Sequence, residues 1–81
     1  MRVRLLFFSV AHDLAGVRET TAELESGAMT GAIRSHLTSL NPRFSEWGDR
    51  IRFAVNQEYV LEEQPLHDGD EVAVIPPVSG G

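Results

Sequence analysis

Residues 68–81 read Asp-Gly-Asp-Glu-Val-Ala-Val-Ile-Pro-Pro-Val-Ser-Gly-Gly, and this stretch decides the fold. Its Asp-Gly-Asp start predicts a sharp turn, because these residues accept the backbone conformations that turns require. The alternating apolar residues of Glu71–Ile75 predict a strand. Since proline has no N–H to donate to a sheet, Pro76 ends that strand. We therefore expect a folded domain over residues 1–75 and an extended tail over residues 76–81.

The tail ends in two glycines, which have no Cβ. A bare backbone of this kind can enter a narrow channel and present its carboxylate to the active site of another protein. The two prolines fix φ and favour an extended conformation in the residue before each of them, which stiffens the tail. The alternative is a frayed or added terminus without function. We favour the functional interpretation, in which Gly81 is the reactive residue and the threading segment comprises Pro76, Pro77, Val78, Ser79 and Gly80.

The spacing of apolar residues predicts the other elements. Met29, Ile33 and Leu37 recur at helical spacing, and Asn41-Pro42 would stop that helix, which we place over Ala28–Leu40. The remaining expectations are a strand that contains Val3, Leu5 and Phe7, a short helical turn over Ser9–Gly16, an edge strand over Arg18–Leu24, a strand over Ile51–Val55, a turn at Asn56-Gln57 and a strand over Tyr59–Leu61. Two strands, a helix and three strands predict an α+β fold of the ubiquitin-like β-grasp type, a mixed sheet of about five strands packed on one main helix.

Alternation within the strands assigns their two faces. In a β-grasp the first and last strands are parallel neighbours, so Leu5, Phe7, Val72 and Val74 share the face that packs on the helix. Residues of the opposite parity face away from it, and they include the apolar side chains of Leu6, Phe8 and Ile75.

These outward apolar residues predict a docking surface beside the exit of the tail. An exposed apolar cluster on a small protein commonly marks an interaction site. The alternative is a different packing of the helix that buries the same residues. We predict a partner interface formed by Leu6, Phe8, Tyr59 and Ile75.

Composition excludes several classes of function. A chain of 81 residues builds one small domain, too small for a deep catalytic cleft. The formal net charge of −5 argues against nucleic acid, whose affinity depends on neutralising phosphates. The chain has no cysteine, so any sulfur that it handles must be added to it. No apolar run is long enough to span a membrane, and we expect a cytoplasmic protein. All seven basic residues are arginine, which either reflects codon bias or keeps side-chain amines away from a reactive terminus.

No cluster of side chains predicts an active site or a metal site. His12, His36 and His67 are scattered, without the spacing of metal ligands. Asp68 and Asp70 flank a glycine before a strand and are better explained as turn formers than as ligands or acid–base groups. Ser9, His12 and Asp13 lie on one short segment and do not predict a catalytic triad. Whether the chain counts as an enzyme is left open, because it looks like a protein that is acted upon.

Several motifs together resemble the small subunit of molybdopterin synthase, the MoaD-like sulfur carriers of the ubiquitin-like β-grasp family. The resemblance covers the whole chain and depends on five stretches, which are Leu6-Phe7-Phe8, Leu14-Ala15-Gly16, Ala54-Val55-Asn56-Gln57, Pro65-Leu66-His67-Asp68-Gly69-Asp70-Glu71-Val72 and Pro76-Pro77-Val78-Ser79-Gly80-Gly81.

The resemblance implies a mechanism. An ATP-dependent adenylyltransferase would activate the Gly81 carboxylate as an acyl-adenylate, and a sulfur donor protein would replace AMP to leave a thiocarboxylate. The tail would then enter the large synthase subunit, in a heterotetramer of two large and two small subunits, and give its sulfur to a pyranopterin. Two such transfers build the dithiolene of molybdopterin. No cofactor would stay bound to this chain, because ATP is used by the partner.

The resemblance also assigns roles to residues. It implies that Phe8, Tyr59 and Ile75 contact the partners, although Tyr59 and Ile75 replace the larger apolar or aromatic residues that are common in the family. Met29 stands where the family often has a Ser or Thr helix cap.

Two related functions stay open. A ThiS-like sulfur carrier for thiazole synthesis shares the fold, the Gly-Gly end and the thiocarboxylate, but usually lacks the Pro-Pro-Val-Ser lead-in. A ubiquitin-like modifier would be joined through Gly81 to lysines of target proteins, and would therefore act as a tag.

Overall fold

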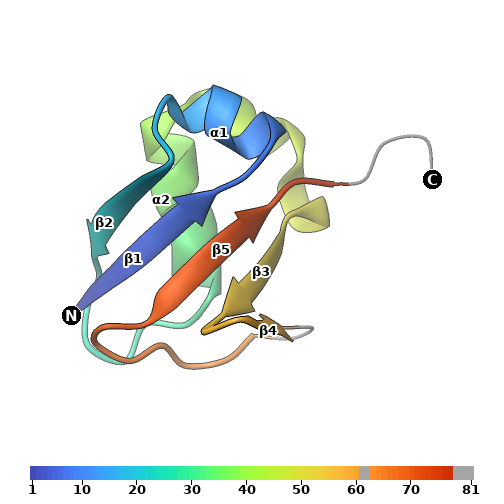
Figure 1. Ribbon diagram of the computed structural model, residues 1–81. Helices are drawn as coiled ribbons and strands as arrows, with labels where there is room; N and C mark the ends of the chain where they lie inside the picture. Colours follow the sequence, from blue (N-terminus) through green and yellow to red (C-terminus); the bar gives the residue numbers. More distant parts are fainter. Residues whose placement is uncertain (61–62, 78–81) are drawn as a thin grey trace.

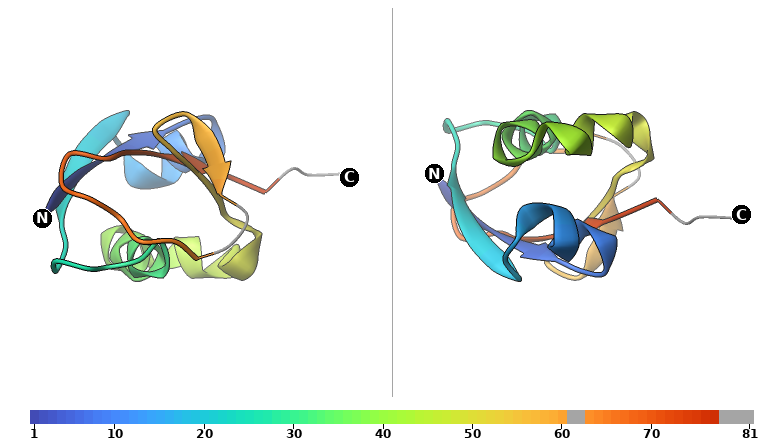
Figure 2. Two further views of the ribbon diagram at one scale, coloured as in Figure 1. Left: turned by 90° about the horizontal axis from the view of Figure 1, so that it is seen from below. Right: turned by 90° about the horizontal axis from the view of Figure 1, so that it is seen from above.

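The fold is a two-layer α+β structure in which a mixed sheet packs against one main helix (Figures 1 and 2). The computed structural model describes residues 1–60 and 63–77. Its elements are β1 (Arg2–Phe7), α1 (Val10–Ala15), β2 (Glu19–Glu23), α2 (Gly31–Leu40), the 3₁₀ helices η1 (Pro42–Glu46) and η2 (Gly48–Arg50), β3 (Arg52–Val55), β4 (Glu58–Val60) and β5 (Glu71–Ile75). This order confirms the predicted β-grasp.

The strand order in the sheet is β2-β1-β5-β3-β4, which leaves β2 and β4 at the edges. β1 and β5 are parallel and lie side by side at the centre, with Leu5 opposite Val72 and Phe7 opposite Val74. The other neighbours are antiparallel. The first and last strands therefore meet as predicted, although they stand at opposite ends of the sequence.

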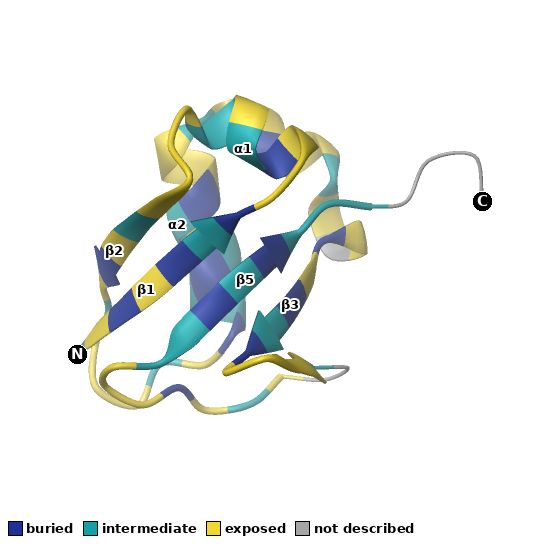
Figure 3. Ribbon diagram, in the orientation of Figure 1, coloured by how far each residue is buried: buried dark blue, intermediate teal, exposed yellow. Residues whose placement is uncertain are grey.

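The core lies between the sheet and α2, and its composition confirms the assigned strand faces. Leu5, Val72 and Val74 are completely buried and Phe7 is 3 % exposed. Figure 3 shows the resulting alternation of buried and less buried residues along β1 and β5. Fourteen apolar residues form one buried cluster, namely Val3, Leu5, Phe7, Ala11, Ala22, Ile33, Leu37, Phe44, Ile51, Phe53, Val55, Leu66, Val72 and Val74.

Phe44 in η1 is a core residue that the sequence did not predict. Its ring lies 5.4 Å from that of Trp47 in an edge-to-face arrangement and 6.4 Å from that of Phe7. The Asn41 side chain accepts a hydrogen bond from the Arg43 amide and starts η1. Asn41-Pro42 ends α2 as predicted, but the chain then turns back onto the core.

The start of α2 differs from the sequence prediction. The helix begins at Gly31 with Thr30 in the N-cap position, and not at Ala28. Ala28 accepts a hydrogen bond from the Leu66 amide, and Met29 forms a β-bridge with Pro65, so these two residues are held outside the helix. The expectation that Met29 occupies the cap position is therefore wrong.

A carboxylate from a distant loop caps α2. Glu63 accepts hydrogen bonds from the Gly31 amide at 3.0 Å and from the Thr30 hydroxyl at 3.3 Å, and it pairs with Arg34 at 3.5 Å. The Thr30 side chain makes no cap bond within its own helix. Glu63 therefore satisfies the free N–H that an isolated helix would expose.

The β3–β4 hairpin has the predicted two-residue turn. Asn56 and Gln57 have φ values of 52° and 73°, as a type I′ turn requires. β4 then runs from Glu58 to Val60; Leu61, which we predicted in the same strand, lies outside the described residues. Among residues 1–60 and 63–77, no helix has the length and apolar character needed to cross a membrane.

Candidate docking face and tail exit

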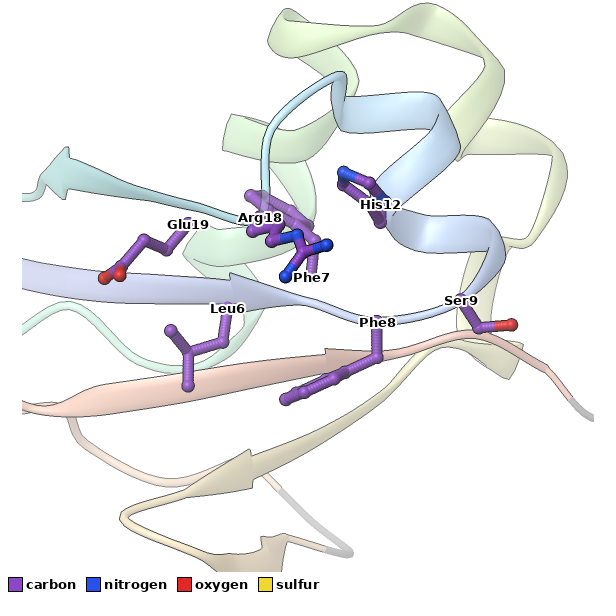
Figure 4. A pocket seen from close by; sticks show the side chains of 7 residues that line it. All are labelled: Leu6, Phe7, Phe8, Ser9, His12, Arg18 and Glu19. Carbon is purple, nitrogen blue, oxygen red and sulfur yellow. The ribbon is translucent and has the colours of Figure 1, made fainter.

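The face of the sheet that points away from α2 carries a row of apolar side chains. Leu6 pairs with Ala73, Ala73 with Ala54, and Ala54 with Tyr59, so the row crosses four strands. Figure 4 shows Leu6 and Phe8 pointing to the same side, over β5. We call this surface the outer patch and define it as Leu6, Phe8, Ala54, Tyr59, Ala73 and Ile75.

The outer patch differs in exposure between its edges and its centre. Phe8 is 54 % exposed and Tyr59 is 70 % exposed. Leu6 and Ile75 are half-buried, which corrects the expectation of an exposed cluster that includes both. The reason is that both belong to central strands: β2 and β5 flank Leu6, and Arg52 of β3 stands opposite Ile75. The four predicted interface residues nevertheless lie on one face.

A strained turn explains why Phe8 is exposed. Ser9 has φ 54° and ψ −129°, a conformation that non-glycine residues rarely adopt, and the Ala11 amide bonds the Phe8 carbonyl across the turn at 3.0 Å. The chain leaves the sheet here and enters α1, which ends at Gly16 with a left-handed φ of 78°. No further strand residue follows Phe8 to cover its ring.

A hollow of about 370 Å³ lies beside Phe8, and we call it the Phe8 hollow. β1, its following turn, α1 and the start of β2 contribute to it (Figure 4). The side chains of Arg18, His12 and Phe8 line the same hollow (Figure 4). The lining residues are Leu6, Phe7, Phe8, Ser9, His12, Arg18 and Glu19.

A second hollow of about 360 Å³ lies where β5 passes into the tail. Arg52 stands opposite Ile75 in the sheet, directly before the two prolines, which are half-buried. We call this site the tail-root hollow, and its lining residues are Arg50, Arg52, Tyr59, Ile75, Pro76 and Pro77. The other predicted tail residues, Val78, Ser79, Gly80 and Gly81, lie outside the described residues.

The aspartates before β5 serve the turn, as predicted. Asp68 accepts a hydrogen bond from the Arg2 amide at 2.7 Å. Asp70 accepts from the His67 amide at 2.8 Å and from the Asn56 side chain at 3.0 Å. In the part of the chain that the structure describes, no three His, Asp or Glu side chains gather as metal ligands would.

Ion pairs join charged side chains of β1, β2 and β5. Arg2 pairs with Glu23 at 2.6 Å, and Arg4 pairs with Glu19 at 3.1 Å and with Glu71 at 3.5 Å. The hydrogen bond from Arg2 to Glu23, together with the charge of that carboxylate, raises the pKa of the Arg2 guanidinium. The two side chains are 67 % and 66 % exposed, so solvent screens this ion pair and it adds little to stability.

The sequence predicted the apolar part of this face but not its arginines. The parity of β3 could have placed Arg52 on the outer face, because Phe53 and Val55 point inward. Arg18, which we predicted as the first residue of the edge strand, lies just before β2, and Arg50 is the last residue of η2. Only the packing of α1 and η2 around the sheet brings them to the two hollows.

A mixed five-stranded sheet packed on one main helix, with the first and last strands parallel at its centre, defines the class of ubiquitin-like β-grasp proteins. The chain belongs to the ThiS family, whose model matches residues 5–81.

Individual proteins of known sequence or structure resemble the whole chain. The molybdopterin synthase sulfur carrier subunit of Chlamydomonas reinhardtii is 41 % identical, and the match covers 100 % of both chains. A Pyrococcus furiosus protein described as molybdopterin converting factor, subunit 1, has a TM-score of 0.84 and 31 % identity over 96 % of this chain and 99 % of its own. The small archaeal modifier protein 1 of Methanosarcina acetivorans has a TM-score of 0.78 and 26 % identity over 99 % and 96 % of the two chains.

Proposed function

We propose that this chain is a sulfur carrier of molybdenum cofactor biosynthesis, the small subunit of a molybdopterin synthase. The observation that carries the proposal is the match to the Chlamydomonas reinhardtii carrier subunit, which extends over both chains from end to end. The Pro-Pro-Val-Ser-Gly-Gly motif and the outer patch beside Pro76 support it.

The proposed chemistry takes place at the carboxylate of Gly81. A carboxylate is a poor electrophile, so a partner adenylyltransferase first joins it to the AMP part of ATP and releases pyrophosphate. Sulfide released by a sulfur donor protein then attacks the acyl carbon and AMP leaves, which gives the Gly81 thiocarboxylate. In the synthase, the sulfur of the thiocarboxylate bonds to the pyranopterin precursor, and water then cleaves the bond between the acyl carbon and sulfur, so that the tail returns to a carboxylate. ATP is a substrate of the partner, and this chain keeps no cofactor.

The folded domain contributes recognition. An apolar centre with a polar surround is typical of a protein–protein interface. The outer patch has this character: Phe8 and Tyr59 present the most exposed large apolar surface, while Leu6 and Ile75 support them from the central strands. The large subunit would bind this face while the tail enters its active site. We propose two copies of each subunit in the assembly and a cytoplasmic location.

The decisive experiment forms the thiocarboxylate in vitro. The purified chain is incubated with its adenylyltransferase, ATP and a sulfur donor, and intact mass is measured. One oxygen should be exchanged for sulfur at Gly81. Deletion of Gly81, or one residue added after it, should abolish the exchange without changing the melting temperature. Sulfur found at the new end of the extended chain would contradict the requirement for a Gly-Gly end.

Experiments in cells distinguish the three candidate functions of this fold. The resemblance to an archaeal modifier protein favours a second candidate, conjugation of Gly81 to lysines of other proteins. Restored molybdoenzyme activity in a strain without its own carrier supports the synthase subunit, and isopeptide conjugates in the same cells support the modifier. Rescue of a thiazole requirement instead would point to the ThiS-like alternative.

A further inference from the structure

Two arginines that form no ion pair with another described residue stand beside the outer patch. Arg18 lines the Phe8 hollow and Arg50 lines the tail-root hollow, and both residues are exposed. The Arg50 guanidinium donates only to main-chain carbonyls, those of Trp47 at 3.3 Å and Glu46 at 3.1 Å. Neither arginine forms an ion pair with any other residue that the structure describes.

Four other arginines form ion pairs with carboxylates of the described residues. They are Arg2 with Glu23, Arg4 with Glu19 and Glu71, Arg34 with Glu63, and Arg43 with Glu46. The protein is acidic as a whole, with a formal net charge of −5. Among the described residues, Arg18 and Arg50 therefore bring positive charge without an ion pair to the two hollows that adjoin the outer patch, while Glu19 of the Phe8 hollow pairs with Arg4.

Main-chain contacts fix both arginines in relation to the sheet. The Phe7 amide donates to the Arg18 carbonyl at 2.8 Å, which holds Arg18 at the end of β1. Arg50 ends η2, and the Arg50 amide bonds the Trp47 carbonyl at 2.9 Å. In the sheet order, Arg18 lies on the β2 side of β1 and β5, and Arg50 lies on the β3 side. The two residues therefore lie on opposite sides of the central pair β1 and β5, and the tail departs from β5.

We propose that Arg18 and Arg50 bind carboxylate side chains of the protein that receives the tail. A guanidinium forms paired hydrogen bonds with a carboxylate, and charged residues around an apolar patch fix the orientation of a partner. Two such contacts on opposite sides of the central pair β1 and β5 fix the orientation of the carrier on its partner, so that the tail points at the opening of the partner's active-site channel. The inference rests on the proposed function, because it requires a partner that takes up the tail.

The test measures binding of the full-length carrier to the purified large subunit of molybdopterin synthase from the same organism. Arg18→Gln and Arg50→Gln are compared with Arg2→Gln, which removes the same charge at the far end of the sheet. At about 50 mM salt, each of the first two variants should raise Kd about fivefold, and at about 300 mM salt the difference should shrink, since exposed charges are screened. Arg2→Gln should bind like the wild type at both salt concentrations.

A further variant separates binding from folding. Arg50→Gln loses two carbonyl bonds, and Arg50→Lys also disturbs them but keeps the charge. We expect Arg50→Lys, which keeps the charge but cannot form the paired guanidinium contacts, to bind more tightly than Arg50→Gln and more weakly than the wild type, whatever its melting temperature. The proposal is wrong if Arg18→Gln and Arg50→Gln follow the Arg2→Gln control. Thiocarboxylate formation at Gly81, measured in parallel, reports the proposed function on its own. A wild-type carrier that forms it and binds the large subunit, while Arg18→Gln and Arg50→Gln bind equally tightly, overturns the arginine proposal alone.

Discussion

Leu6 of β1 and Tyr59 of β4 lie in one row across the outer face of the sheet, joined by Ala73 and Ala54. The two alanines keep the middle of the row low, while the Tyr59 ring stands out with 70 % of its surface exposed. A partner can therefore approach the central strands closely between larger side chains. The row also links the Phe8 hollow, which Leu6 lines, to the tail-root hollow, which Tyr59 lines.

Phe7 and Phe8 provide a matched pair that separates folding from docking. Phe7 is 3 % exposed and Phe8 is 54 % exposed. Phe7→Ala should lower the free energy of unfolding by about 3–5 kcal/mol, because it leaves a cavity in the core. Phe8→Ala should scarcely change it, yet should weaken binding to the large subunit by about 2 kcal/mol or more if Phe8 is a hot spot. Thermal melts and titrations of both variants check this. A strongly destabilised Phe8→Ala protein with normal binding would contradict the assignment.

Glu63 and Gly31 should be energetically coupled. Glu63→Ala should cost about 1 kcal/mol, the usual value of an N-terminal helix cap, while the same change at exposed Glu58 should cost less. A Cβ on residue 31 would lie 2.8 Å from the Glu63 carboxylate, so Gly31→Ala must displace that cap. Gly31→Ala should therefore be more favourable in the Glu63→Ala background than in the wild type. Denaturant unfolding of the four proteins of this cycle gives the coupling, and strictly additive effects would contradict the cap.

Gln57 occupies a turn position that suits glycine better. Its φ of 73° lies in the left-handed region, which costs roughly 1 kcal/mol for a residue with a Cβ. Gln57→Gly should therefore stabilise the β3–β4 hairpin and raise the melting temperature. Glycine placed at exposed Glu58, inside β4, is the control and should lower it. A fall in stability on Gln57→Gly would show that the Gln57 side chain contributes more than the strain costs.

His12 and Asp68 should have no part in sulfur transfer. If the chain is a co-substrate without catalytic side chains, His12→Ala and Asp68→Asn should transfer sulfur from a preformed thiocarboxylate within a few-fold of the normal rate. Loss of general acid–base catalysis would instead slow the reaction by roughly 10²–10⁴. Stopped-flow single turnovers with saturating large subunit measure the rate apart from binding. A loss of that size in either variant would assign this chain a part of the active site.

Binding should also depend on the state of the tail. The carrier is spent after one transfer and must leave the large subunit before it is loaded again. Its complex should therefore be weaker with the Gly81 carboxylate than with the thiocarboxylate. Titration of the large subunit with the two forms tests this. Equal affinities would show that the change from thiocarboxylate to carboxylate does not promote release of the carrier.

The sequence by itself determined the strands and the helix whose apolar residues recur at a regular spacing. Its composition excluded several classes of chemistry. Alternation in β1 and β5 predicted Leu5, Phe7, Val72 and Val74 as core, because a strand exposes successive side chains to opposite faces. Glycine, proline and aspartate marked the turns, since these residues act on the local backbone.

Only the tertiary structure decided features that depend on contacts between distant segments. The bridge from Met29 to Pro65 and the carboxylate of Glu63 moved the start of α2 to Gly31, although the local sequence favoured an earlier start. Phe44 enters the core from a 3₁₀ segment without apolar periodicity. Arg18 and Arg50 reach the hollows beside the outer patch from the segment before β2 and from η2, whose directions are set by packing. The spacing of apolar residues shows which face of a segment is apolar. It does not show which distant segments lie against that face, and these contacts decide the positions named above.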